Sequence, residues 1–389
     1  MADPPRASAS FAKTEDVNPK SVYEGSPNGC RAGGLPQLFP SHSPSRKNRQ
    51  LEKGRPFAMQ NVLITGGAGY VGHLLAPRLL SEGYHVTVYD QLYFGCRLPN
   101  SPNLRVVQGD IRDMPKLAEA LVGQDAVLHL ACISNDASFE LDEKLSESIN
   151  YDCFEPIVIA AKEAGVKRFV YCSSSSVYGV SESPDVTEDH PLVPLTLYNK
   201  FKGMCEPVLW KHKGDDFTCV VIRPATICGY SPRTRLDLSV NILTNHAVNK
   251  GAITVFGGNQ MRPNLHVEDM VDAYLQMLTA PHEKIHGETF NIGFQNYSIA
   301  EIAGMVKKVV QEELPEKGEI KIVTTPTNDM RSYHVNSDKV TRVLGFKPKR
   351  SIEDAVRDLT RAFRNHLMPN SFDDDWYYNV RTMKKLGAK

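Results

Sequence analysis

The 389-residue chain lacks several features that mark nucleic-acid-binding, membrane and disulfide-rich proteins. Its 45 basic and 45 acidic side chains leave no net charge, which argues against binding nucleic acid through a basic surface. No uncharged apolar run approaches the roughly 18 residues that a membrane helix needs. None of the eight cysteines belongs to a CxxC pair, and most lie in apolar runs. We therefore expect reduced, buried thiols in a cytosolic enzyme rather than a disulfide frame or a zinc knuckle.

The first 58 residues differ from the rest in composition. They are rich in Pro, Ser, Gly and Asn and show no hydrophobic periodicity, so we expect a disordered N-terminal extension over residues 1–58. The segment lacks the apolar stretch of a secretory signal, and Asp3, Glu15 and Asp16 are unusual in a mitochondrial presequence. Together with the cysteine pattern, this favours a cytoplasmic protein.

Short apolar runs alternate with amphipathic segments from residue 60 onward. The sequence predicts strands over residues 61–64, 85–90, 104–108, 126–131, 168–173 and 219–223, and helices over residues 70–81, 115–122 and 146–164. Because the strands are continuous apolar runs separated by helices, we expect a parallel sheet covered on both faces. Right-handed crossovers then give a doubly wound, Rossmann-type α/β fold.

A glycine-rich turn follows the first predicted strand directly. Residues 65–72 read TGGAGYVG, which places Gly66, Gly69 and Gly72 at GxxGxxG spacing. Such a turn needs residues without Cβ, because a pyrophosphate must approach bare backbone N–H groups, here including those of Tyr70 and Val71. Its position between a strand and a helix predicts a dinucleotide-binding site.

Acidic residues end the second and third predicted strands. Asp90 lies 18 positions beyond Gly72, where a carboxylate accepts both ribose hydroxyls and repels a 2′-phosphate. This favours NAD over NADP, unless Arg97 folds back to supply a cation. A turn or helix-cap aspartate is the alternative for Asp90. Asp110 and Ile111 can hold the adenine, or Asp110 can cap the next helix; the sequence leaves both interpretations open.

The alternation becomes less regular after residue 223, where prolines separate shorter elements. We expect a smaller α+β lobe there, with a strand at residues 289–292 returning to the main sheet. The predicted organisation is an NAD-binding Rossmann domain at 59–229, a mainly substrate-binding lobe with segments returning to the sheet at 230–370, and a C-terminal tail at 371–389.

A tyrosine and a lysine at helical spacing form a candidate catalytic pair. Tyr198 and Lys202 are four residues apart and would share one helix face. The charge of Lys202, with that of an oxidised nicotinamide ring, would favour the phenolate of Tyr198 and lower its pKa from about 10 towards neutrality, making it a base. A hydroxyl from the serine run 173–176, at the end of the fifth strand, can bond the same substrate oxygen.

These motifs, in this order, resemble the extended short-chain dehydrogenase/reductase family in its nucleotide-sugar epimerase/dehydratase branch. The resemblance covers about residues 60–365. It includes the glycine turn, Gly109-Asp110, His129-Leu130-Ala131, Ser176-Val177-Tyr178-Gly179, Tyr198 with Lys202, and the stretch RPNLHVED at 262–269.

Several site residues are implied by the resemblance alone. It makes Ser174 the catalytic hydroxyl that also binds substrate, places Leu130 and Ala131 beside the cofactor, and puts Asn150 near the active-site backbone. It further implies that Arg262 and Arg331 bind the diphosphate of a sugar nucleotide, which suits two guanidinium groups on a separate lobe.

Departures from the family pattern bear on the reaction. Family 4,6-dehydratases follow the catalytic hydroxyl with acidic residues, where this chain has Ser175 and Ser176. The 4-epimerases often have an asparagine near the substrate phosphate, where this chain has Thr226. We expect an NAD-dependent nucleotide-sugar epimerase that oxidises a hydroxyl, at C4, to a transient ketone and re-reduces it on the other face. The alternatives are a reductase, decarboxylase or dehydratase on the same fold, or a non-catalytic NAD-binding sensor.

The resemblance also implies a homodimer, with the helix at 146–164 as one candidate interface. We expect no metal site. The HExxH pattern at 282–286 is bracketed by Pro281 and Gly287, which leaves little helix to bring both imidazoles onto one face. The acidic run 373–375 lies in a polar tail that we expect to be docked or mobile.

Overall fold

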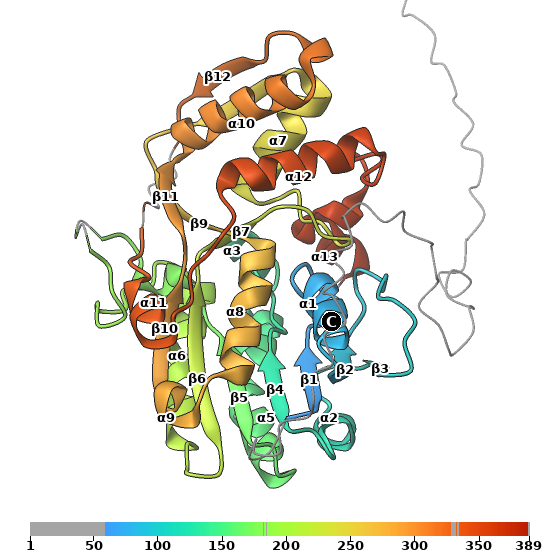
Figure 1. The fold of residues 1–389 in the computed structure, drawn as a ribbon, viewed down its shortest axis with the longest axis vertical. Coiled ribbons are helices and arrows are strands. Elements are labelled where there is room, and N and C mark those ends of the chain that lie inside the picture. Colours follow the sequence, from blue (N-terminus) through green and yellow to red (C-terminus); the bar gives the residue numbers. More distant parts are fainter. Residues whose placement is uncertain (1–58, 182, 184, 328–331, 333, 388–389) are drawn as a thin grey trace, which may run out of the picture.

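The computed structural model describes residues 59–387 except 182, 184, 328–331 and 333 (Figure 1). The predicted N-terminal extension at 1–58 and Arg331 lie outside the described residues.

Seven parallel strands form the main sheet, in the order β10-β6-β5-β4-β1-β2-β3. They are β1 (Asn61–Thr65), β2 (His85–Asp90), β3 (Leu104–Gln108), β4 (Ala126–His129), β5 (Arg168–Cys172), β6 (Thr218–Pro224) and β10 (Glu288–Ile292). The predicted doubly wound fold is confirmed, as is the return of a late strand to the sheet, because β10 pairs with β6 at its edge. The order reverses between β1 and β4, and ligands bind at such a switch point in this class of fold.

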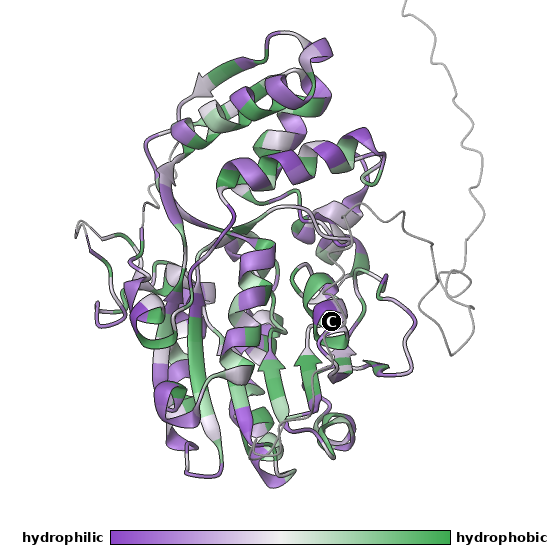
Figure 2. Ribbon diagram, in the orientation of Figure 1, coloured by the Kyte–Doolittle hydropathy of each residue, from purple (hydrophilic) through white to green (hydrophobic). Residues whose placement is uncertain are grey.

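Helices cover both faces of this sheet. One face is covered by α1 (Gly72–Ser81), α8 (Val267–Thr279) and α11 (Asp338–Leu344), and the other by α2 (Met114–Leu121), α5 (Phe154–Glu163) and α6 (Leu197–Lys211). Figure 2 shows β1 and β4 as hydrophobic strands, whereas α8 carries both hydrophilic and hydrophobic residues. Leu75 and Leu79 of α1 are fully buried, and each such side chain contributes about 1.5–3 kcal/mol to stability.

The prediction of one helix over residues 146–164 is wrong. A short helix α4 (Glu143–Glu147) leads into a π-helical turn, η2 (Ser148–Asp152), and α5 begins only at Phe154. Asn150 in this turn accepts a hydrogen bond from the N–H of Ile133 (2.8 Å) and donates one to its carbonyl (3.0 Å). This pairing with a loop that follows β4 is a tertiary contact, so the local hydrophobic pattern does not reveal the break.

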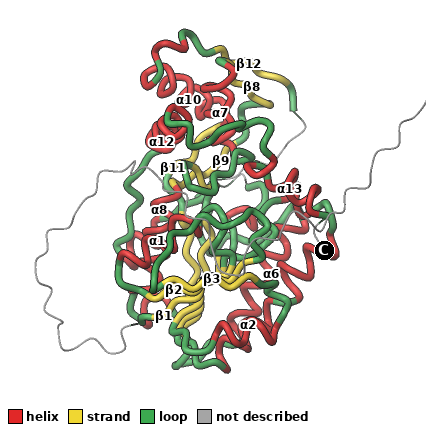
Figure 3. Tube along the Cα trace, turned by 90° about the vertical axis from the view of Figure 1, so that its right-hand side faces the viewer, coloured by secondary structure: helices red, strands yellow, loops and turns green. Residues whose placement is uncertain are grey.

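Further elements lie beyond the carboxyl ends of the main-sheet strands (Figures 1 and 3). Three helices pack around a separate core that contains Val240, Ile302 and Leu359. These helices are α7 (Ser239–Lys250), α10 (Ile299–Glu313) and α12 (Ile352–Arg364). Two small sheets join them, one of β7 (Thr226–Cys228), β9 (Met261–His266) and β11 (Gln295–Ser298), the other of β8 (Ala252–Phe256) and β12 (Lys321–Thr325). The remaining short elements are α3 (Asp136–Phe139), η3 (Ser175–Tyr178), α9 (His282–Ile285), η4 (Pro315–Lys317), η5 (Asp375–Tyr377) and α13 (Asn379–Leu386).

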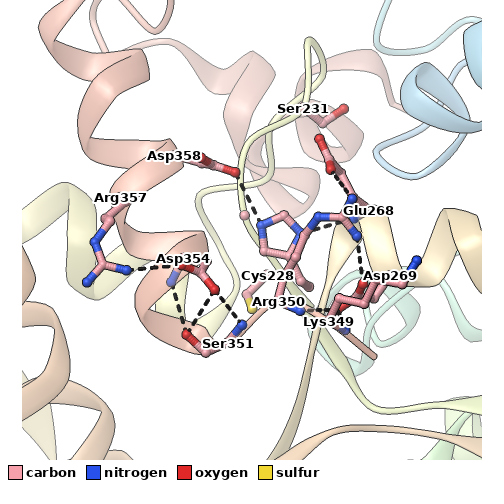
Figure 4. A network of polar contacts seen from close by, with 12 residues as sticks. Cys228, Ser231, Glu268, Asp269, Lys349, Arg350, Ser351, Asp354, Arg357 and Asp358 are labelled. Atoms are coloured by element: carbon pink, nitrogen blue, oxygen red, sulfur yellow. Dashed lines mark hydrogen bonds and ion pairs between the residues drawn. The ribbon is translucent and has the colours of Figure 1, made fainter. Parts of the chain in front are cut away.

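An ion-pair network joins α12 to α8 and β9 (Figure 4). Arg350, just before α12, contacts Asp269 (2.6 Å) and Glu268 (2.8 Å) at the start of α8. His266 at the end of β9 lies with its Nε2 atom 3.3 Å from a carboxylate oxygen of Asp358 on α12. Because Asp269 is only 1% exposed, removal of Arg350 would leave a buried charge without its partner, so the network holds the two groups of elements in one orientation.

The other expectations have mixed outcomes. Six described cysteines are free thiols, but Cys96 is disulfide-bonded, contrary to the expectation of reduced thiols throughout. No helix among the described residues is both long and apolar enough to cross a membrane. The HExxH segment contains only the four-residue helix α9, and Nδ1 of His282 is hydrogen-bonded to Thr218 (2.8 Å).

A buried arginine holds the C-terminal end of α8. Arg168 on β5 is 4% exposed, and its guanidinium group donates to the carbonyl oxygens of Met277 (2.7 Å), Leu278 (2.6 Å) and Ala280 (3.0 Å). These carbonyls have no helical partner, because they lie at the end of the helix.

We predict that Arg168→Met lowers the free energy of unfolding by about 2–4 kcal/mol, because it leaves three buried carbonyls unpaired. Urea denaturation followed by circular dichroism measures this. Arg105→Met, on the exposed surface of β3, is the matched control and should change stability by at most about 0.5 kcal/mol. Equal effects of the two substitutions would contradict the structural role of Arg168.

Candidate active site

A cavity of about 390 Å³ lies at the carboxyl ends of the main-sheet strands. Its wall contains every residue that the sequence nominated for cofactor binding, namely Gly66, Gly69, Tyr70, Val71, Gly72, Asp90, Asp110, Ile111, Leu130, Ala131, Tyr198 and Lys202. Ser174 and Thr226 line it too. The tertiary structure therefore brings together nominated residues that are up to 160 positions apart in the chain, from Gly66 to Thr226.

The glycine turn has no room for side chains. A Cβ on Gly66, whose φ of +73° favours glycine, would lie 2.7 Å from the backbone nitrogen of Ala131. A Cβ on Gly72 would collide with the backbone of Gly67. Since α1 begins at Gly72, its N-terminal N–H groups border the cavity. Bare backbone at a helix N-terminus is the environment that a dinucleotide diphosphate requires, so the turn fits the expected cofactor.

Asp90 holds the turn and faces the cavity. Its carboxylate accepts hydrogen bonds from the N–H groups of Ala68 (2.9 Å) and Leu92 (2.8 Å), one on each oxygen. Each oxygen keeps a lone pair, as a ribose contact requires. Burial raises the pKa of Asp90, and these bonds oppose the rise. Arg97 lies 4.0 Å over the ring of Trp376 and is not in the cavity wall, so its loop folds back without supplying a cation there.

Asp110 does not cap the following helix. Its carboxylate pairs with the guanidinium group of Arg112 (2.6 Å) and accepts the N–H of that residue (2.8 Å). Asp113 caps α2 instead, through the N–H of Lys116 (3.3 Å). Of the two interpretations that the sequence left open for Asp110, the helix cap is wrong.

Ser174, Tyr198 and Lys202 reach the cavity from two elements. Ser174 follows β5, and its Oγ lies 2.7 Å from Oγ of Ser176 and accepts the N–H of that residue (3.1 Å). Tyr198 and Lys202 lie one turn apart on α6. Lys202 is 3% exposed, and its ammonium group donates to the carbonyl of Cys172 (2.7 Å), which ends β5. This bond fixes α6 against the strand that carries Ser174.

Burial dominates the ionisation of Tyr198. It raises the pKa of this phenol well above the usual value, Cys132, Cys172 and Asp136 raise it further, and Arg235 opposes them. The phenol is therefore protonated at neutral pH in this structure. Its expected activation by Lys202 stays a prediction, and additional positive charge in the cavity is needed to form the phenolate.

A buried ion pair supports the serine turn. Arg223 on β6 bonds both carboxylate oxygens of Glu206 on α6, at 3.0 Å and 2.6 Å. Glu206 also accepts the hydroxyl of Ser173 (2.6 Å), and Arg223 donates to the hydroxyl of Tyr178 (2.7 Å). Because Ser173 and Tyr178 flank Ser174 along the chain, the pair fixes the backbone from which that hydroxyl projects.

A smaller hollow of about 200 Å³ adjoins the cavity and shares Asp136, Ser176, Thr226 and Leu238 with it. Arg262 on β9 lines the hollow, and its Nη1 atom donates to the carbonyl of Met261 (2.9 Å). The second nominated arginine, Arg331, is outside the described residues.

Many residues of the cavity wall were not nominated from the sequence, and four of them come from late, less regular parts of the chain. Arg233 and Arg235 come from the loop after β7, and Asn379 and Met383 from α13 in the C-terminal tail. The two arginines stand in the stretch SPRTRLD, but nothing in its local pattern distinguishes them from surface arginines. The tail is docked, since the indole N–H of Trp376 donates to the carbonyl of Phe94.

Comparison with known proteins identifies the class. Residues 62–293 match the NAD dependent epimerase/dehydratase family, and the chain belongs to this family. Its cofactor is accordingly NAD, for which the glycine turn and Asp90 are suited.

Individual relatives differ in activity. The UDP-glucose 4-epimerase of Lactobacillus helveticus is 29% identical over 340 residues, which cover 80% of this chain and 99% of that protein. The dTDP-D-glucose 4,6-dehydratase of Mus musculus is 28% identical over 344 residues, covering 83% and 94%. The structure of MoeE5 in complex with UDP-glucuronic acid and NAD aligns with a TM-score of 0.68 at 25% identity, covering 79% of this chain and 99% of that one.

We predict that Gly72→Ala weakens NAD binding by about 10-fold or more, because the new Cβ forces α1 away from the turn. Isothermal titration calorimetry with NAD measures the affinity. Gly304→Ala is the matched control, since Gly304 lies on the exposed face of α10 and a Cβ there meets nothing within 4 Å. The control should bind NAD like the wild type, whereas wild-type affinity in Gly72→Ala would contradict the close approach.

Proposed function

We propose that the protein is an NAD-dependent nucleotide-sugar epimerase that inverts C4 of the sugar through a bound ketone. One observation carries the proposal: a single cavity wall contains the glycine turn together with Ser174, Tyr198 and Lys202, and it adjoins the hollow lined by Arg262. The glycine turn of the cavity suits the cofactor. The guanidinium group of Arg262 in the hollow suits the diphosphate of a nucleotide sugar.

The residues of the cavity have complementary roles in the proposed reaction. When bound, NAD would supply the hydride acceptor and donor, and its oxidised ring would add positive charge. Tyr198, as phenolate, takes the proton of the sugar hydroxyl, while Ser174 holds the same oxygen. Lys202 keeps a positive charge near the phenol. After the sugar presents its other face, Tyr198 returns the proton to the oxygen of the re-formed alcohol.

The serines after Ser174 favour epimerisation over dehydration. Ser176 donates to the amide oxygen of Asn199, and its Oγ lies 2.7 Å from that of Ser174. Ser175 is 1% exposed. Both side chains are neutral hydroxyls, which lack the acidity that elimination of water requires at these positions. The arrangement thus supports a reaction in which the ketone is reduced again, rather than one in which water is eliminated.

We predict that Tyr198→Phe lowers the rate of epimerisation by about 10²–10⁴-fold, because it removes the acid–base group. The assay incubates purified protein with UDP-, dTDP- and GDP-sugars and identifies products by nuclear magnetic resonance. In the wild type, the rate should rise with pH from neutral to alkaline values, because burial raises the pKa of Tyr198 and the phenolate is the active form.

Tyr151→Phe is the matched control, since Tyr151 packs against Phe201 and does not line the cavity. It should retain the wild-type rate. Undiminished epimerisation in Tyr198→Phe would remove the proposed mechanism. Release of CO₂ from UDP-glucuronic acid, or a 4-keto-6-deoxy product, would instead identify a decarboxylase or a dehydratase.

We predict that Arg262→Gln raises KM for the nucleotide sugar by about 10- to 100-fold and changes kcat little, because the lost contacts are to the diphosphate and not to the reacting carbon. Steady-state kinetics with varied nucleotide sugar measures both constants. Arg364→Gln, on the exposed side of α12, should leave KM unchanged. An unchanged KM in Arg262→Gln would remove the role of Arg262 in substrate binding.

The proposal includes a cytoplasmic location, which the cysteine pattern and the N-terminal composition favour, and a homodimer, which the family resemblance implies. The role of Arg331 as a second diphosphate ligand also stays a prediction.

A further inference from the structure

One wall of the cavity carries a buried arginine that the proposed reaction does not use. Arg233, in the loop after β7, is 1% exposed and is the largest of the fully buried side chains in the described part of the chain. It lines the same cavity as Gly69, Tyr70 and Val71 of the glycine turn.

The guanidinium group of Arg233 is incompletely paired. Its Nη2 atom donates to the amide oxygen of Asn379 (2.6 Å). Its Nε and Nη1 atoms are buried and have no hydrogen-bond partner among the described residues. A buried cation with unpaired donors costs several kcal/mol, so such a group is retained where an anion completes it.

The surroundings of Arg233 hold it without neutralising it. Its guanidinium group lies 3.7 Å from the centre of the Phe94 ring. The two nearby carboxylates have other partners, since Asp90 accepts two backbone N–H groups and Asp237 pairs with Arg235 (2.9 Å). Burial, together with the nearby charge of Arg235, lowers the pKa of Arg233 to about 9, although Asp237 and Asp90 oppose this shift. The site is thus short of negative charge.

The loop that carries Arg233 is fastened to the glycine turn. The hydroxyl of Ser231 donates to the carbonyl of Tyr70 (2.7 Å), and the hydroxyl of Tyr70 donates to the carbonyl of Gly229. One bond uses the backbone carbonyl of Tyr70, and the other uses its side-chain hydroxyl. They fix Arg233 at the edge of the cavity where the first N–H groups of α1 lie.

We propose that Arg233 binds the diphosphate of NAD together with the glycine turn, and that Asn379 in the C-terminal tail positions it. The unpaired Nε and Nη1 atoms donate to phosphate oxygens, as the planar fork of arginine does well. The diphosphate supplies the missing negative charge. Cofactor binding therefore depends on the loop after β7 and on α13, and not only on the Rossmann strands.

The experiment compares ligands that contain or lack the diphosphate. The full-length protein, freed of nucleotide, is titrated calorimetrically with NAD, ADP-ribose and AMP. Arg233→Met is expected to weaken binding of NAD and ADP-ribose alike, by about 10- to 100-fold, and to change AMP binding less than about 3-fold. Arg233→Lys, which keeps the charge but not the fork, should lie between these values. It also tests the proposal if the methionine variant does not fold.

Asn379→Ala tests the positioning role. It leaves the charge of Arg233 in place, so it should weaken NAD binding less than Arg233→Met, and the double variant should bind like Arg233→Met alone. Additive losses in the double variant would show that Asn379 acts independently of Arg233 and would overturn its positioning role.

Arg97→Met is the matched control for charge, because Arg97 is an exposed arginine that stacks on Trp376 outside the cavity wall. It should change NAD affinity less than about 2-fold, far less than the 10-fold or greater loss expected for Arg233→Met. Equal NAD affinity in Arg233→Met and wild type would overturn the proposal. So would a larger loss for NADP than for NAD, which would place Arg233 at the ribose. A loss confined to UDP binding by the NAD-loaded enzyme would assign Arg233 to the substrate.

This inference rests on the NAD that the family uses and not on epimerisation. The binding measurements therefore remain decisive even if the sugar product proves not to be an epimer.

Discussion

The approach of α1 to the glycine turn is the constraint on which the site depends. Gly72 begins the helix against the backbone of Gly67, at a separation that no residue with a Cβ allows. This contact places the N-terminus of α1 at the carboxyl end of β1, where the strand order of the sheet reverses. The remaining groups of the cavity are useful because they converge on this point from neighbouring strands.

A second layer of interactions completes the cavity from distant parts of the chain. The hydroxyl of Tyr70 reaches the carbonyl of Gly229, and Asn379 joins Arg233 to the rest of the wall. The N–H of Asn379 also donates to Asp237 (3.2 Å), and its side-chain amide donates to Ser134 (3.0 Å). One tail residue thus contacts the loop after β4 and the loop after β7. The C-terminal tail is therefore a structural part of the site and not an appendage.

The electrostatics of the cavity determine whether Tyr198 can act as a base. Burial keeps the phenol of Tyr198 protonated, although Lys202 and Arg235 both lie in the same wall. When the oxidised cofactor is bound, its cationic ring would favour the phenolate form of Tyr198. In the proposed reaction, proton transfer by Tyr198 would therefore require the bound cofactor.

How much could be predicted differs from residue to residue for physical reasons. The strands and the glycine turn follow from contiguous patterns, and β1, β2 and β3 begin and end within one residue of their predicted bounds. The π-helical turn at Asn150 could not be predicted from the local pattern, because the partner of Asn150 is Ile133, 17 positions away. The cap of α2 depended on where the helix begins, because Asp113 immediately precedes Met114 whereas Asp110 pairs with Arg112.

Sequence by itself determined the doubly wound fold, the family and the nominated residues that line the cavity, because each of these depends on short-range periodicity or on a local motif. Only the tertiary structure decided that Arg233, Arg235 and Asn379 enter the cavity and that the phenol of Tyr198 is protonated in it. Burial and long-range pairing set these properties, and both arise from contacts between segments whose local patterns carry no record of each other.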